Sequence, residues 1–439
     1  MTATHQNQTT HQATHVSIAD ALTAVTPDGL PFRFTAYDGS SAGPDDAAIG
    51  LHLANERGLS YVLTAPGDLG LARAYVTGDL EVSGVHPGDP YDVARLLDEV
   101  HFRRPTPAEA LRIVRGLGWS HLKPPPVPPQ EHAPRWRRTV DGLRHSRHRD
   151  QVAIQHHYDV SNRFYELVLG PSMTYTCAVF PKPDASLEEA QAEKYDLVAR
   201  KLGLRPGMRL LDVGCGWGGM VRHAVREYGV TALGVTLSRQ QAEWAQAMIE
   251  REGLTGTAEV RHSDYRDVNE TGFDAISSIG LTEHIGVRNY PAYFGFLLDH
   301  LKPEGRLLNH CITRPHNRHQ GVGAFIDRYI FPDGELTGSG RIITEAQDAG
   351  FEVRHAENLR EHYALTLAGW SRNLESNWQD AVDEVGLATA KVWGLYLAGC
   401  RAGFERNDVQ LHQVLAVRLS DRLSGTASSG FPLRPDWLS

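Results

Sequence analysis

Residues 208–219 read MRLLDVGCGWGG, and they give the clearest indication of the fold class. The run 208–213 is apolar enough for a buried strand, and the glycines after it let the backbone turn sharply and approach a ligand without a Cβ in the way. Residues 218–229 then have the pattern of a helix that Gly229 closes. Many nucleotide-binding folds share this turn, and a tight turn that binds nothing is the alternative. The stretch predicts one strand–turn–helix unit of an α/β fold.

The same alternation of strands and helices continues after this unit. Strands are expected at 208–213, 230–237, 256–264, 273–280, 305–312, 351–357 and 411–420, and helices at 218–229, 238–253 and 289–305. Ser238 is the expected N-cap of the second helix. Strands that alternate with helices predict a mainly parallel sheet covered by helices on both faces.

The ends of the second and third strands distinguish between two cofactor classes. A dinucleotide fingerprint needs an acidic residue about 20 residues after the glycine loop. Here the second strand ends in GVTLSRQQ (234–241), with no acid at its tip. The third strand ends in HSDYRD, where Asp264 and the ring of Tyr265 are placed to hold an adenine. The pattern favours S-adenosylmethionine over a dinucleotide.

Composition limits the class of protein. A chain of 439 residues exceeds one ordinary core, so a sizeable domain and a smaller one are expected. The net charge of -9 argues against coating nucleic acid. No apolar run approaches the roughly 18 residues that span a bilayer, and residues 1–15 do not resemble a signal peptide. The four cysteines lack metal-type spacing, which is typical of reduced thiols in a cytoplasm.

Five segments are expected along the chain. They are a disordered tail (1–15), a small mixed domain (16–120), a proline- and arginine-rich linker (121–150), a large α/β domain (151–424) and a C-terminal tail (425–439). In the linker, the spacer KPPPVPPQ precedes a cluster of arginines: Arg135, Arg137, Arg138, Arg144, Arg147 and Arg149. This cluster is either a solvated linker or a foot on acidic phospholipid headgroups, where each basic residue contributes about 1 kcal/mol.

Eight motifs, taken together, identify a family. In chain order they are HHYDVSNRFYELVLGPSMTYTCAVF, LLDVGCGWGG, VTLSRQQ, DYRDV, GLTEHIG, LNHCI, YIFPDGEL and EHYALTLAGW. Over nearly all of 151–424 the chain resembles the cyclopropane-fatty-acyl-phospholipid synthases and the related mycolic acid methyltransferases. The resemblance implies a class I S-adenosylmethionine-dependent methyltransferase fold, which is Rossmann-like with a mostly parallel seven-stranded sheet, beside a smaller mixed N-terminal domain.

The resemblance also implies a reaction and a set of residues. The cis double bond of an unsaturated acyl chain in a membrane phospholipid attacks the methyl group of S-adenosylmethionine, a bound bicarbonate removes a proton, and a cyclopropane ring closes. The implied catalytic residues are His157, Cys177, Glu283, His310, Ile312 (through its backbone) and Tyr363, with Cys400 as a further active-site cysteine of unclear role. The implied cofactor residues are Tyr175, Thr176, Asp212, Gly214, Gly216, Gly218, Thr236, Gln241, Asp264, Tyr265 and Arg266.

The sequence leaves the product and the substrate class open. Thr282 and Cys311 depart from the family's usual residues and flank the expected base site, so they bear on the product. The alternative product is a mid-chain methylene branch, which a separate reductase would convert to a methyl branch. A small-molecule methyltransferase and a non-catalytic, membrane-associated S-adenosylmethionine-binding protein are alternative functions. The chain could also form a homodimer. A zinc site from His310, Cys311 and His316 is not expected.

The motif GLTEHIG (280–286) carries a specific expectation. Glu283 should lie at the carboxyl end of the fourth strand and face the cofactor cleft, with His284 turned away from it. A helix start is not expected there. The protein is expected in the cytoplasm, at the inner face of the membrane.

Overall fold

The computed structural model describes residues 16–132, 160–318, 321–331, 334–420, 429–435 and 437. The chain divides into two compact units, one made of Met1–His86 and Asp92–Pro129 and the other of Pro87–Tyr91 and Gln130–Ser439. The division after Pro129 falls inside the stretch 121–150. The six linker arginines, His157 and the tail 1–15 lie outside the described residues.

The smaller unit is built on a mixed four-stranded sheet. The elements before residue 130 are α1 (Ile18–Val25), β1 (Arg33–Ala36), β2 (Ser41–Ala42), β3 (Gly50–Leu53), α2 (Glu56–Thr64), α3 (Asp68–Val76), β4 (Leu80–Ser83), α4 (Tyr91–Glu99) and α5 (Pro107–Leu117). The strand order is β2-β1-β3-β4, and only β1 and β3 are parallel. Inward-facing residues such as Phe34, Leu51 and Leu53 alternate with outward-facing ones, so one face of the sheet forms the core.

The larger unit contains a seven-stranded sheet. Its strands are β5 (Arg209–Val213), β6 (Thr231–Thr236), β7 (Ala258–His262), β8 (Phe273–Ile279), β9 (Leu301–Thr313), β10 (Phe351–Asn358) and β11 (Gln410–Arg418), in the order β10-β11-β9-β8-β5-β6-β7. The strands from β9 to β7 are parallel, and β11 is antiparallel to both of its neighbours. All seven predicted strands are therefore confirmed.

The helices of this unit are α8 (Asn162–Leu169), α9 (Leu187–Leu202), α10 (Gly219–Tyr228), α11 (Arg239–Arg251), α12 (Thr282–Ile285), α13 (Tyr290–His300), α14 (Ala324–Tyr329), α15 (Ser339–Asp348), α16 (Arg360–Ser376), α17 (Trp378–Val385) and α18 (Leu387–Glu405). Ser238 caps α11 as predicted, because its hydroxyl accepts a hydrogen bond from the Gln241 amide. The helix predicted to reach residue 305 is wrong at its end. It stops at His300 because Pro303 cannot continue a helix, and β9 begins at once.

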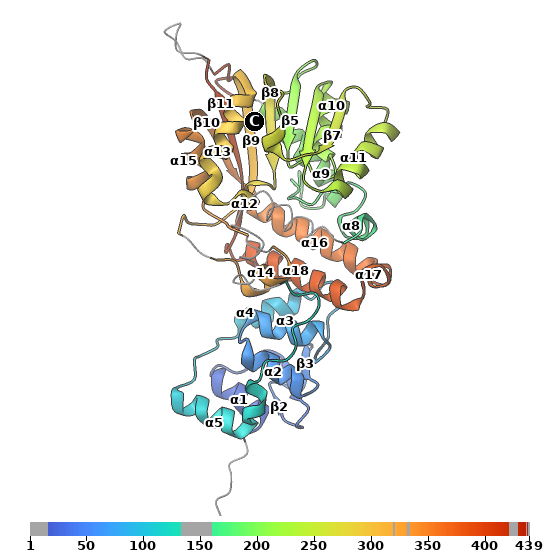
Figure 1. Ribbon diagram of the computed structural model, residues 1–439. Helices are drawn as coiled ribbons and strands as arrows, with labels where there is room; N and C mark the ends of the chain where they lie inside the picture. Colours follow the sequence, from blue (N-terminus) through green and yellow to red (C-terminus); the bar gives the residue numbers. More distant parts are fainter. Residues whose placement is uncertain are drawn as a thin grey trace, which may run out of the picture. The chain divides into compact units, whose positions relative to one another are not determined.

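Alternate residues of the strands fill two separate cores. Leu210 and Leu308 pack on the face covered by α9, α10 and α11, whereas Leu211 and Cys311 pack on the face covered by α13 and α15. Figure 1 shows α16, α17 and α18 lying together beyond the end of the sheet where α12 begins, which is the carboxyl end of the parallel strands. Ligands in open α/β sheets bind at this end, so these helices close over the expected site.

Candidate active site

The glycine loop begins directly after β5. Gly214 has φ 75°, and a Cβ there would meet the Leu281 side chain at 3.0 Å, so the turn requires glycine on both conformational and steric grounds. The backbone amides of Gly214 and Cys215 both donate to the Val235 carbonyl, at 2.9 and 3.0 Å, which ties the loop to β6. The loop is thus held open at the carboxyl edge of the sheet.

Two adjoining cavities lie around this loop, and they share Gly214, Gly216 and Gln241 in their walls. Most of the predicted cofactor residues line one or both: Tyr175, Thr176, Asp212, Gly214, Gly216, Thr236, Gln241, Tyr265 and Arg266. Gly218 does not line them. It is the N-cap of α10, and a Cβ there would meet the Ala245 Cβ at 3.1 Å. The carboxylate of Asp264 pairs with the Arg266 guanidinium beside the second cavity.

Lys194 is a residue of this site that the sequence did not reveal. It lies on α9, is fully buried, lines the first cavity and donates a 3.1 Å hydrogen bond to Thr176 Oγ1. Burial lowers the pKa of Lys194 to about 7, although the Asp212 and Cys177 side chains raise it in part. Burial likewise raises the pKa of Asp212 to about 6, while a hydrogen bond from Ser277 opposes the shift. Two buried ionisable side chains, Lys194 and Asp212, thus line the first cavity within electrostatic reach of each other.

The spacing of the buried residues on α9 could have identified Lys194 from the sequence. On α9 the buried positions include 190, 194, 197, 198 and 201, which is the one-sided pattern of a packed helix face. A lysine on that face needs a polar function or partner, because burying an unpaired charge is costly.

Glu283 lies on α12, just beyond the end of β8. Its Oε1 accepts a hydrogen bond from the Ile312 amide of β9 at 3.4 Å, and its Oε2 is buried with no partner among the described residues. Burial raises the pKa of Glu283 to about 7. Glu283 follows the fourth strand as predicted, but it does not line either cavity beside the glycine loop, and its place at the cofactor cleft stays a prediction.

Two expectations about GLTEHIG are wrong. Thr282–Ile285 is a short helix, because Gly280, at φ 75°, ends the strand and the chain turns directly into it. His284 is not turned away from the cleft. It lines the second cavity together with Tyr265, and its ring stands 5.6 Å from that of Phe331.

His310 is fully buried on β9, on the face covered by α9. Its Nδ1 lies 3.2 Å from Nε2 of Gln413, and its own Nε2 is buried with no partner in the described parts of the chain. Burial, with the nearby charges of Lys194 and Lys201, holds the pKa of His310 well below its ordinary value. The imidazole is neutral at neutral pH.

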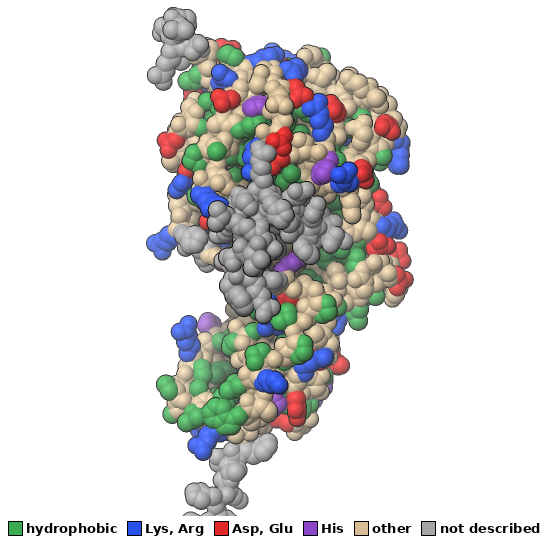
Figure 2. Space-filling view, viewed as in Figure 1, with side chains coloured by type: hydrophobic (Ala, Val, Ile, Leu, Met, Phe, Trp, Pro, Cys, Tyr) green, Lys and Arg blue, Asp and Glu red, His purple; other side chains and the backbone are tan. Residues whose placement is uncertain are grey.

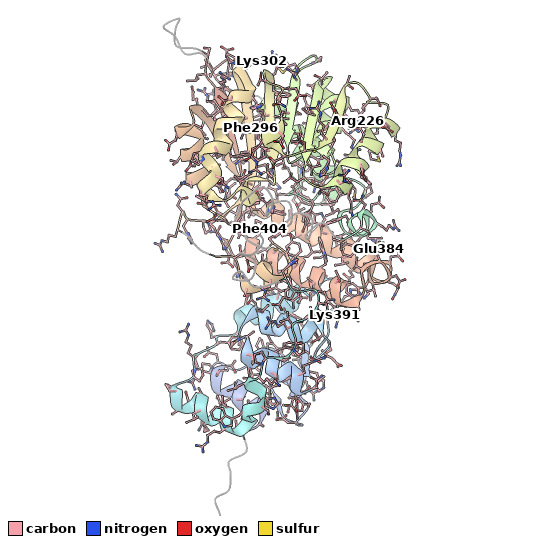
Figure 3. The ribbon with its side chains drawn as sticks, viewed as in Figure 1. Arg226, Phe296, Lys302, Glu384, Lys391 and Phe404 are labelled. Carbon is pink, nitrogen blue, oxygen red and sulfur yellow. The ribbon has the colours of Figure 1, made fainter. Side chains whose placement is uncertain are left out.

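Cys177, Glu283 and Cys400 all lie within electrostatic reach of Tyr363. Burial raises the pKa of the Tyr363 hydroxyl, and the neighbouring Tyr396, Cys177, Glu283 and Cys400 raise it further. The Tyr363 ring packs on Phe404 of α18 with centroids 4.4 Å apart, and Figure 3 labels Phe404. Burial also raises the pKa of the Cys177 thiol and that of Cys400, the latter to about 12. Both cysteines are therefore protonated thiols rather than nucleophiles.

Thr282 and Cys311 flank the base site along the chain and lie on the face of the sheet opposite His310, where Cys311 is within electrostatic reach of Glu283. Side chains of a strand alternate between faces, so Asn309 and Cys311 point away from the side of His310. The Thr282 hydroxyl lies on the same face as these two side chains and donates a hydrogen bond to Asn309. Within the described residues, no group of three histidine, cysteine or acidic side chains could hold a metal ion.

Aromatic rings form one wall beside the first cavity. The Tyr175 ring lies 5.4 Å from Trp370 of α16 and 5.8 Å from Trp393 of α18. Tyr165 of α8 packs against Tyr175 and Trp217. This wall joins the glycine loop to the helices beyond the sheet, and it presents an apolar surface next to the cofactor residues.

Comparisons with known proteins agree with this geometry. Residues 145–414 match the family model described as mycolic acid cyclopropane synthetase. The chain is 61% identical over 425 residues to a probable fatty acid methyltransferase of Mycobacterium tuberculosis, covering 96% of this chain and 98% of that protein. It is 37% identical over 273 residues to the cyclopropane-fatty-acyl-phospholipid synthase of Escherichia coli K12, covering 62% and 69%.

A solved structure is also similar. A mycolic acid cyclopropane synthase, crystallised with S-adenosylhomocysteine (SAH) and CTAB, superposes with a TM-score of 0.57 at 35% identity. The match covers 61% of this chain and 97% of that one.

Proposed function

Because the chain belongs to the mycolic acid cyclopropane synthetase family, we propose that it converts the cis double bond of a phospholipid acyl chain into a cyclopropane ring. It is an S-adenosylmethionine-dependent fatty acyl methyltransferase with the class I methyltransferase fold. The phospholipid substrate, the ring product and the use of bicarbonate are the proposed parts.

One observation carries the proposal: two buried polar atoms, Oε2 of Glu283 and Nε2 of His310, have no partner among the described residues and lie at the carboxyl edge of the sheet. Glu283 reaches the Ile312 amide, and Ile312 shares a face of β9 with His310. Buried polar groups are normally satisfied, so this pair fits a small polar ligand such as bicarbonate. The groups that would hold it are Glu283, His310, the Ile312 backbone and Tyr363.

In this reaction S-adenosylmethionine supplies the electrophilic methyl group, and bicarbonate, when bound, supplies the base. An alkene is a weak nucleophile, so the site must hold it close to the methyl group. Lys194 and Thr176 help to orient the cofactor on one side of the glycine loop. The aromatic wall of Tyr175, Trp370 and Trp393 excludes water, which would otherwise trap a carbocation as an alcohol.

A membrane substrate is supported by the smaller unit. Of the large apolar side chains that are exposed in the described residues, five lie between 102 and 127: Phe102, Leu111, Trp119, Leu122 and Val127. Figure 2 shows hydrophobic side chains gathered on this unit over α5, with Lys and Arg nearby. A basic surface with exposed tryptophan and leucine favours the interface of an anionic bilayer. Among the described helices, none is long and apolar enough to cross a membrane.

A methylene-branched product is the second candidate. The relative with 61% identity is named a fatty acid methyltransferase rather than a cyclopropane synthase. The same cation gives a methylene branch when a hydride shift precedes the loss of the proton, and a separate reductase would complete a methyl branch.

The test is expression in a host that is rich in monounsaturated phospholipids and makes no cyclopropane lipids itself. Mass spectrometry and proton NMR of the extracted fatty acids then identify the product. Ring protons support the proposal, and vinylidene protons support the methylene alternative. An acyl profile identical to that of the empty-vector control would refute both.

A further inference from the structure

Three polar side chains form a single row across the sheet. Glu357 of β10 pairs with Gln413 of β11, and Gln413 pairs with His310 of β9, each as direct partners in the antiparallel register. Direct partners on adjacent strands point to the same face with their Cβ atoms about 5 Å apart. The row therefore leads from the partly exposed carboxylate of Glu357 to the fully buried ring of His310.

Lys201 of α9 covers this row. Its ammonium forms an ion pair with Glu357 and donates a 2.7 Å hydrogen bond to Oε1 of Gln413. Its side chain is 1% exposed. An ammonium group only donates hydrogen bonds, so it accepts nothing from the Gln413 amide.

The orientation of the Gln413 amide follows from this contact. With Oε1 facing Lys201, Nε2 faces His310 Nδ1 at 3.2 Å. The reversed amide would place its NH2 group against the Lys201 ammonium, donor against donor. Since the NH2 group can only donate, Nδ1 of His310 must be the acceptor and carries no hydrogen.

We propose that Gln413 and Lys201 are positioning residues that hold neutral His310 in the tautomer with its hydrogen on Nε2, so that Nε2 donates a hydrogen bond to the anion in the base site. The identity of the anion rests on the proposed function, but the tautomer does not. A neutral imidazole has one hydrogen, and Gln413 leaves only Nε2 to carry it.

The tautomer explains the composition of the site. Nε2–H of His310 supplies a donor, and above about pH 7, where Glu283 has lost its proton, the Glu283 carboxylate supplies an acceptor. Hydrogen carbonate has both acceptor oxygens and one O–H donor, so it satisfies both groups at once. A simple halide would satisfy only the donor. The row across β10, β11 and β9 thus selects for an anion that carries its own hydrogen.

The first experiment uses the unmodified protein labelled with ¹⁵N-histidine. Long-range ¹H–¹⁵N correlation spectra distinguish protonated from unprotonated ring nitrogens, and the loss of one ring system in His310→Gln assigns the signals. We expect Nε2 of His310 to be protonated and Nδ1 to be bare. Sodium bicarbonate should shift the Nε2 resonance. A protonated Nδ1 in the unmodified protein would overturn the proposal without bearing on the lipid product.

The second experiment reverses the direction of the hydrogen bond between residue 413 and His310. In Gln413→Glu the new carboxylate accepts from Nδ1–H, so the hydrogen should move from Nε2 to Nδ1 and the bicarbonate shift should disappear. We expect kcat to fall by about 10- to 100-fold, by analogy with the partners of metal-bound histidines, with the KM for S-adenosylmethionine unchanged. Retention of the Nε2 hydrogen, or of full kcat after it has moved, contradicts the proposal.

Gln410→Glu is the matched control. It makes the same change on the same strand, but the Gln410 amide bonds to Asn407 and not to His310. The control should keep the tautomer, the bicarbonate shift and kcat. If Gln413→Glu does not fold, the spectrum of the unmodified protein still decides the tautomer. If the enzyme modifies no lipid, the proposed function fails while the tautomer is still measured.

Discussion

The hydroxyl of Thr282 donates a 2.6 Å hydrogen bond to Oδ1 of Asn309, whose Nδ2 in turn reaches the thiol of Cys311 at 3.5 Å. The two residues that depart from the family's usual types are thus joined to each other, on the face of the sheet opposite His310. They were expected to influence the product by flanking the base. Both pack beneath α12 and β9, while the Glu283 charge raises the pKa of the Cys311 thiol, so their influence on the product stays a prediction.

Thr282→Ala should therefore affect stability more than chemistry. The substitution leaves Oδ1 of Asn309 buried without a donor, at a cost of about 1–3 kcal/mol. Denaturant unfolding measures that loss, and fatty acid analysis should give an unchanged product. Thr344→Ala, at an exposed position on α15, is the control and should stay within about 0.5 kcal/mol. A changed ratio of ring to methylene product would restore Thr282 to the reaction site.

Glu283→Gln should abolish alkylation while nearly retaining cofactor binding. The amide removes the acceptor oxygen that faces the base site, and Glu283 does not line either cavity beside the glycine loop. Product assays and calorimetric titration with S-adenosylhomocysteine separate the two effects. Glu361→Gln, an exposed position on α16, should behave as the unmodified enzyme. Full activity of Glu283→Gln would remove Glu283 from the catalytic set.

The raised pKa of Glu283 also predicts how stability changes with pH. The folded protein holds this proton up to about pH 7, whereas the unfolded chain releases it near pH 4.5. Between these values the folded state binds more protons, so the free energy of unfolding falls as the pH rises. Over that window the unmodified protein should lose more than about 1.4 kcal/mol, the equivalent of one pKa unit, relative to Glu283→Gln. Parallel stability curves for the two proteins would contradict the shift.

Lys194→Met should weaken cofactor binding. Methionine keeps the apolar length of the buried side chain but removes the ammonium that bonds to Thr176 in the cavity. Hydrogen bonds from charged groups contribute about 1.5–3 kcal/mol, so the dissociation constant should rise by about tenfold or more. Calorimetry with S-adenosylmethionine measures it. Lys302→Met removes an exposed ion pair with Asp274 and should leave the affinity unchanged. An unaltered affinity in Lys194→Met would assign the lysine to packing alone.

The arginine cluster 135–149 leads to a prediction about binding to anionic membranes. Replacing its six arginines by glutamine should weaken binding to anionic phospholipid vesicles at least about tenfold at low salt, and the difference should shrink at high salt. Vesicle co-sedimentation measures the effect. Replacement of six exposed arginines elsewhere, at positions 205, 226, 239, 251, 341 and 372, controls for net charge. Equal binding of the linker variant at low salt would identify the cluster as a solvated linker.

The order and type of the helices and strands could be predicted from the sequence, because buried parallel strands are short apolar runs bounded by glycine and polar turns. The runs 208–213 and 273–280 carry this signal directly and match β5 and β8 within a residue. The end of α13 was missed although Pro303 marks it, because the apolar residues before the proline continue the helical pattern.

Contacts between side chains were harder to predict from the sequence, because they depend on the register between strands. Glu283, His310 and Tyr363 were assigned through the family motifs, and the structure brings Glu283 and Tyr363 within electrostatic reach of each other. Gln413 could not be assigned in this way. Its contact with His310 joins residues 103 positions apart and exists only once β11 lies beside β9. Lys194 was missed because a lysine is ordinarily read as a surface residue.

The position of β11 has a consequence for the biosynthesis of the enzyme. The strand that fixes the His310 ring is inserted between β9 and β10, yet it is translated after both of them and after α16, α17 and α18. A ribosome-bound chain can therefore fold its glycine loop and the parallel part of the sheet long before His310 has its partner. Domains begin to fold during synthesis, so a nascent chain able to hold the cofactor would still lack an ordered base site. We therefore expect methyl transfer to begin only after residue 418 has left the ribosome tunnel.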